Sequence, residues 1–185
     1  MPFGERVVLL LRGVNMGGKM RVPMPAWRET LVRLGYRDVQ TYINSGNAVV
    51  TLPGPLTDRT PIESAVAASL LAELGVQTEV VLRTCEEVRA VLAANPLAAY
   101  ATDGARYYVG FLRHDPHSNG IAALAERETA PDRICVLGRE VYVWYANGAH
   151  RSPLGIALLE RTLRAPLTLR NWNTVRALAA LVCSG

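Results

Sequence analysis

The order of the predicted elements is the strongest constraint on the fold of this chain, because one order occurs twice. Residues 7–12 (VVLLLR) form a short apolar run that predicts a buried strand, and a glycine-rich loop ends it. A helix is predicted over residues 25–34. Strands are then predicted over residues 39–43 and 48–52, and the turn at residues 44–47 (NSGN) joins them as a hairpin. The first order is therefore β-α-β-β.

A second helix and a fourth strand complete this first unit. Thr60 and Glu63 form a capping box with Pro61 at the first helical position, and residues 78–82 (TEVVL) predict a strand. The resulting order, β-α-β-β-α-β, is the ferredoxin-like arrangement, in which helices cover one face of an antiparallel sheet.

The rest of the chain begins with a connecting helix and then repeats β-α-β-β. A capping box of Thr84 and Glu87 opens the connecting helix over residues 85–94. The repeat and two final helices are predicted at residues 106–112, 120–128, 133–137, 140–145, 154–163 and 173–182. The predicted fold class is α+β, with two associated ferredoxin-like subdomains and mainly antiparallel sheets. We expect a first half at residues 1–83 and a connecting helix with the second half at residues 84–185, packed as one compact body.

The composition favours a cytosolic protein without a membrane segment. The apolar run from Val7 to Leu11 is far shorter than the roughly 20 residues that span a bilayer, and it lacks the features of a signal peptide. Cys85, Cys135 and Cys183 are odd in number, widely spaced and without a CxxC pair. This pattern argues against a disulfide framework and against a structural zinc site.

The loop after the first strand has the spacing of a phosphate-binding P-loop. Residues 13–19 (GVNMGGK) match GxxxxGK and end at Lys19, the single lysine among 20 basic residues. However, Met20 replaces the Ser or Thr that binds magnesium, and Pro23 and Pro25 prevent a helix from starting at the lysine. We therefore predict that the loop is not a nucleotide-hydrolase P-loop.

The same loop has the residues of a simpler anion site. Glycine allows backbone amides to form a nest for an anion, and Lys19 adds a positive charge. In β-α-β-β the first two strands run parallel, so this loop and the turn at residues 44–47 emerge at the same sheet edge. We expect Asn15, Ser45 and Asn47 to lie beside Lys19.

A third polar segment, residues 170–174 (RNWNT), precedes the last predicted helix. Asn173 is a suitable N-cap and Asn171 can also cap locally, whereas Arg170 is left as a further positive charge. His114 and His117 are three residues apart, but no third ligand accompanies them, so no metal site is predicted.

Several motifs together resemble those of an uncharacterised bacterial family, the one catalogued as domain of unknown function sixteen ninety-seven. They are VVLLLRGVNMGGK, YINSGN, VVLRTCEEVRAVLAANPL, HRSPL and TLRNWNTV. The resemblance covers nearly the whole chain and implies two associated ferredoxin-like subdomains. It brings no activity, substrate or cofactor. This chain has Pro153 where the family usually has a lysine between serine and leucine.

The leading hypothesis is a binding protein for a small anionic ligand, phosphorylated or nucleotide-like, at the Gly13–Lys19 and Asn44–Asn47 loops. The candidate ligand-binding residues are Arg12, Asn15, Gly17, Gly18, Lys19, Ser45, Asn47, Arg170, Asn171 and Asn173. The alternatives are an enzyme acting on such a ligand, a nucleic-acid-binding module and a protein-interaction module. The net charge of +4 permits nucleic acid, but no basic stripe favours it. The oligomeric state is left open.

Overall fold

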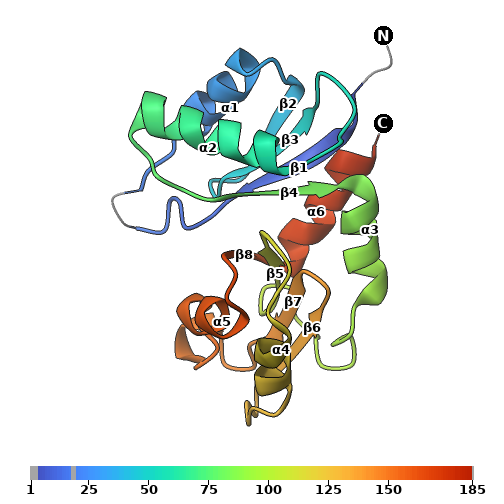
Figure 1. The fold of residues 1–185 in the computed structure, drawn as a ribbon. Helices are drawn as coiled ribbons and strands as arrows, with labels where there is room; N and C mark the ends of the chain where they lie inside the picture. The colour runs from blue at the N-terminus through green and yellow to red at the C-terminus, as the bar shows by residue number, and fades with distance from the viewer. Residues whose placement is uncertain (1–3, 18–19, 185) are drawn as a thin grey trace. The chain divides into compact units, whose positions relative to one another are not determined.

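The chain folds into two units, and each contains a four-stranded antiparallel sheet (Figure 1). A computed structural model describes residues 4–17 and 20–184. The first unit comprises Met1–Val88 and Leu178–Gly185, and the second comprises Arg89–Ala177. These sheets confirm the α+β class predicted from the sequence. No helix in the described ranges is long and apolar enough to cross a membrane.

The first unit has the predicted element order. Its elements are β1 (Arg6–Leu11), α1 (Met24–Arg33), β2 (Arg37–Tyr42), β3 (Asn47–Thr51), α2 (Thr60–Leu74) and β4 (Val80–Thr84). The strands lie in the order β2-β3-β1-β4, and each neighbouring pair is antiparallel. Strand β1 is therefore central, which explains why its residues Val7 to Leu11 are all buried.

The core of the first unit lies between the sheet and its two helices. Figure 1 shows α1 and α2 on one face of this sheet. Alternate β1 residues Val7 and Leu9 pack in one cluster with Trp27 of α1 and Leu70 of α2, as the two-residue period of a strand requires.

The second unit has the same strand order. Its elements are β5 (Tyr107–Leu112), α4 (Ser118–Ala125), β6 (Arg133–Leu137), β7 (Glu140–Trp144), the 3₁₀ turn η1 (Ala149–Arg151), α5 (Ile156–Leu163) and β8 (Leu167–Asn171). The order β6-β7-β5-β8 places β5 where β1 lies in the first sheet. Strand β8 was not among the predicted elements, although its residues alternate between apolar and polar as in a strand, and its pairing with β5 is a long-range contact.

One further helix follows the last strand of each sheet. They are α3 (Cys85–Ala94) and α6 (Trp172–Cys183), and the units divide within these helices, at Val88 and at Ala177. The boundary expected from the sequence precedes α3, whereas the first unit of the structure also includes the end of α6.

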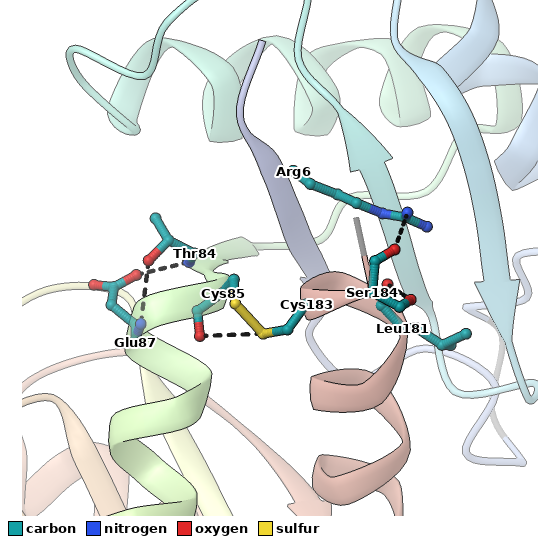
Figure 2. The surroundings of a disulfide bond; sticks show 7 residues. All are labelled: Arg6, Thr84, Cys85, Glu87, Leu181, Cys183 and Ser184. Carbon is teal, nitrogen blue, oxygen red and sulfur yellow. Dashed lines mark hydrogen bonds between the residues drawn. A yellow bond between two sulfur atoms is a disulfide. The ribbon is translucent and has the colours of Figure 1, made fainter. Parts of the chain in front are cut away.

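A disulfide bond joins the start of α3 to the end of α6 (Figure 2). Cys85 and Cys183 have their Cα atoms 5.3 Å apart although they are separated by 98 residues in the sequence. The expectation that the cysteines form no disulfide is therefore wrong for this pair, because only tertiary folding brings the two helix ends together. Cys135 is free.

Candidate functional site

The loop between β1 and α1 has an alternating backbone conformation. Gly13, Asn15 and Gly17 have positive φ angles of 68°, 57° and 79°, whereas Val14 and Met16 do not. Alternation of left-handed and right-handed residues turns successive backbone N–H groups toward one concave side, and this is the geometry of an anion-binding nest. The N–H groups of Met16 and Gly17 make no hydrogen bond with another residue of the described ranges.

Asn15 holds this loop in shape and ties it to the β2–β3 turn. Its side-chain amide donates hydrogen bonds to the carbonyl oxygens of Val22 and Asn44, each at 2.9 Å. Its Oδ1 accepts the N–H of Val22 at 2.9 Å. Asn tolerates the left-handed conformation better than most residues, so one residue serves both the backbone and the bridge. The Asn15 amide is therefore a structural tie.

The β2–β3 turn packs directly against the end of β1. Leu11 donates its N–H to the carbonyl oxygen of Gly46 at 2.8 Å. A Cβ atom on Gly46 would lie 2.7 Å from the side chains of Leu11 and Val14, and Gly46 also has a φ of +70°. Only glycine fits there. The two loops are neighbours, which confirms the topological prediction.

Other predicted site residues of this unit lie in different environments. The backbone of Arg12 is bonded to the carbonyl of Glu79 and to the hydroxyl of Thr78. Ser45 is half-buried in the turn. Asn47 is fully buried and donates to the carbonyl oxygen of Tyr42 at 3.1 Å. Gly18 and Lys19 lie outside the described residues, so the lysine at the centre of the prediction stays a prediction.

A cavity of about 440 Å³ lies against these loops. Its lining residues are Asn15, Gly17, Arg21, Val22, Pro23, Met24 and Asn44. Arg21 and Asn44 were not among the predicted ligand residues. The signal that could have identified Arg21 is that it lies two residues after Lys19 in the same loop.

The cavity is electrostatically suited to a negative charge. None of the described residues that line it is acidic, and the sequence has no Asp or Glu between Glu5 and Glu29 or between Asp38 and Asp58. The Arg21 side chain is exposed and makes no hydrogen bond or ion pair with another described residue. A guanidinium group with free donors, next to a backbone nest, is a recurrent arrangement for binding phosphate or carboxylate.

The start of α1 agrees with the expectation that this is not a hydrolase P-loop. The helix begins at Met24, with Pro23 as its N-cap and a proline in its first turn. In a P-loop the helix starts at the lysine itself, so the helix dipole points at the phosphates. Here four residues separate Lys19 from the helix start at Met24.

The RNWNT segment belongs to the second unit and has a counterpart in the first. Arg170, near the end of β8, is buried, and it donates to the hydroxyl of Thr168 at 2.6 Å and to the carbonyl of Leu169 at 2.8 Å. Its burial lowers the pKa of the guanidinium to about 10. Arg83 has the same place near the end of β4, is also buried, and donates to the preceding carbonyl, of Leu82, at 2.9 Å.

The residues after these two arginines are also equivalent. Asn171 accepts the N–H of Thr174 at 2.9 Å, and Thr84 accepts the N–H of Glu87 at 3.2 Å. Each therefore caps the helix that follows its strand. Asn173 lies inside α6, and its side chain occupies the space next to Gly104. Trp172 stacks on Tyr107 with ring centroids 4.8 Å apart. These contacts give the segment a structural role in its own unit.

Within the described ranges, no three His, Cys, Asp or Glu side chains are grouped to hold a metal ion.

Comparison with known proteins identifies a family without an assigned activity. The family model described as "Protein of unknown function (DUF1697)" matches residues 5–142. Among solved structures, a conserved bacterial protein from Streptococcus pneumoniae is similar, with a TM-score of 0.73 and 24% sequence identity. That similarity covers 96% of this chain and 98% of the other, and at this identity it concerns the fold. No curated protein matches the sequence.

Proposed function

The chain belongs to the DUF1697 family of proteins of unknown function, and we propose a function for it from its own structure. We infer that it is a cytosolic protein that binds a small anionic ligand at the Gly13–Lys19 and Asn44–Asn47 loops. The ligand class is a phosphorylated or nucleotide-like molecule. The observation that carries the proposal is the Arg21 side chain, which is paired with no other described residue. It lies on a cavity with no acidic residue in its described lining, next to the alternating backbone of Gly13 to Gly17.

Each part of the site has a separate contribution. The N–H groups of Met16 and Gly17 donate to anionic oxygens, and Arg21 neutralises their charge in a bidentate contact. Asn15 is committed to the loop itself through Val22 and Asn44, so it holds the nest in shape before a ligand arrives. A preformed site loses less conformational entropy on binding. Lys19 is proposed as the second cation.

The screen that tests the proposal measures the melting temperature of the protein with nucleotides, sugar phosphates, pyrophosphate and short oligonucleotides. A ligand that binds only the folded form raises the melting temperature. Stabilisation by phosphorylated small molecules supports the proposal, and stabilisation by oligonucleotides alone favours a nucleic-acid-binding module. Product formation in the same samples would identify an enzyme.

Variants at the cavity then locate the site. We expect Arg21→Gln to weaken binding of the stabilising anion about tenfold to a hundredfold, since a charge-assisted hydrogen bond contributes roughly 1.5–3 kcal/mol. Titration calorimetry measures the affinity. Arg161→Gln, on an exposed position of α5, removes the same charge from the second unit and serves as the control. Equal affinities for both variants would contradict the proposed site.

A further inference from the structure

The disulfide lies at two helix ends of opposite polarity. Cys85 is the first residue of α3, and Cys183 is the last residue of α6 (Figure 2). Both cysteine residues are half-buried, so neither is fully enclosed in the core. A disulfide that is enclosed in the core is protected from exchange, whereas one that is not fully enclosed is more open to it.

The surroundings of the two sulfur atoms favour different protonation states after reduction. The dipole at the start of α3 stabilises a thiolate on Cys85, and the dipole at the end of α6 disfavours one on Cys183. Two carboxylates share the first turn of α3. Glu87 is paired with Arg59 at 3.0 Å, and Glu86 is exposed to solvent, which screens it.

A reduced Cys183 would also have a hydrogen-bond acceptor already in place. Its Sγ atom lies 3.5 Å from the carbonyl oxygen of Cys85. The neutral thiol can donate there without rearrangement, so the geometry accommodates the dithiol as well as the disulfide.

We propose that Cys85 and Cys183 form a reversible thiol–disulfide site that exchanges with a low-molecular-weight thiol of the glutathione class. The thiolate of one such molecule attacks Sγ of Cys183, the bond to Cys85 breaks, and Cys85 leaves as the thiolate. A second thiolate attacks the external sulfur of the mixed disulfide and releases Cys183. Two thiols are oxidised to one external disulfide, and their two protons and two electrons reduce the protein pair.

Reduction releases the covalent tie on the end of α6. The hydrogen bonds that remain there, from Arg6 to the carbonyl oxygen of Ser184 at 3.2 Å and from the Ser184 hydroxyl to the carbonyl oxygen of Leu181 at 3.1 Å, are exposed. Leu178 and Val182 are buried, so apolar packing keeps the helix in the folded unit after the bond opens. The exchange therefore acts on a native protein. This inference does not depend on the anion site.

The experiment equilibrates the oxidised full-length protein with increasing ratios of reduced to oxidised glutathione. Samples are quenched in acid, unfolded and alkylated, and mass spectrometry counts the labelled cysteines. Unfolding before labelling is needed because burial raises the pKa of the Cys135 thiol and slows its reaction. We expect one label, on Cys135, in the oxidised protein and three at low-millimolar reduced glutathione, with the circular dichroism spectrum unchanged. The melting temperature should fall by about 5–15 °C on reduction.

Variants assign the effect to the pair. Cys183→Ser should remove the dependence of the melting temperature on glutathione, whereas Cys135→Ser should retain it. Short labelling of the reduced, folded protein should modify Cys85 before Cys183. Three labels in the oxidised protein, or a bond that stays closed in about 10 mM reduced glutathione until the protein is heated to unfolding, would overturn the proposal, and neither result depends on a variant that folds.

Discussion

The two units share a strand order but differ at one sheet edge. Strands β1 and β5 are equivalent, yet the connection after β1 runs over residues 12–23, whereas the connection after β5 is residues 113–117. The longer connection has the alternating backbone and the cavity with Arg21. At the opposite end the units agree, because Arg83 and Arg170 are both buried before a capped helix. The comparison shows that the elements shared by both units stabilise the fold, whereas the candidate site lies on a loop that only the first unit has in this long form.

The largest expected difference concerns the two hairpin turns. Gly46→Ala should destabilise the protein by about 3 kcal/mol, because the left-handed backbone disfavours a side chain and the new methyl group would overlap Leu11 and Val14. Gly138→Ala, in the β6–β7 turn, has a similar φ of +57° but its nearest neighbour would be 3.8 Å away. This matched change should cost about 1–2 kcal/mol. Urea unfolding measures both, and equal losses would mean that the β2–β3 turn is not specially packed.

The two helix caps should respond alike. Thr84→Ala and Asn171→Ala each remove one side-chain acceptor from the first turn of a helix, so each should destabilise by about 1 kcal/mol. Replacement of either residue by serine keeps an acceptor and should restore most of the loss. The same unfolding assay tests this. A much larger loss of unfolding free energy for Asn171→Ala than for Thr84→Ala would show that the two caps are not equivalent. A change in ligand affinity for Asn171→Ala would make Asn171 a candidate ligand-binding residue again.

The smallest expected effect is a pH dependence of the α3 cap, where Glu87 is the third residue of the helix. Burial opposes ionisation of Glu87, but hydrogen bonds from Thr84 and Arg59 outweigh it, and the pKa of the carboxyl group lies below its usual value. A carboxyl with a depressed folded pKa stabilises the protein above its unfolded pKa, and this contribution is lost as the pH falls through the folded pKa. Thr174, at the equivalent position of α6, has no such group.

Glu87→Gln should therefore destabilise the protein at neutral pH by a few tenths to about 1 kcal/mol and have less effect in acid. Melting temperatures between about pH 7 and pH 3 measure the difference. A variant that loses as much stability at the acid end as at neutral pH would show that the carboxylate charge is not what matters.

The sequence predicted most of the framework because its signals are local. The apolar run of β1, Pro61 in the first turn of α2 and the NSGN turn each specify an element within a few residues, and the ferredoxin-like order follows from their succession. The predicted Thr60–Glu63 capping box is wrong, because the N-cap of α2 is Arg59, without a side-chain cap hydrogen bond, and the buried Glu63 accepts the N–H of Leu82 at 2.8 Å instead. The start of α3 at Cys85 was predicted correctly from its capping box. Strand β8 was missed although Leu167 to Arg170 alternate between apolar and polar, and its place in the sheet depends on pairing with the distant strand β5.

The site was only partly predictable for a similar reason. Topology alone placed the glycine loop beside the β2–β3 turn, and the hydrogen bond from Asn15 to Asn44 confirms it. Residue type suggested Asn15 and Asn47 as ligand groups, whereas the structure ties Asn15 to the loop and buries Asn47. Whether a polar side chain faces a cavity or the protein depends on its neighbours in space.

The sequence by itself thus determined the order of elements, the duplication and the neighbouring loops, since periodicity, turn chemistry and chain connectivity act over short distances. Tertiary structure decided three other features: the pairing of Cys85 with Cys183, the exposure of Arg21 on the cavity and the burial of Arg170. Each of these depends on which distant residues meet when the core forms, because burial and contact are properties of the packed chain and have no local pattern in the sequence.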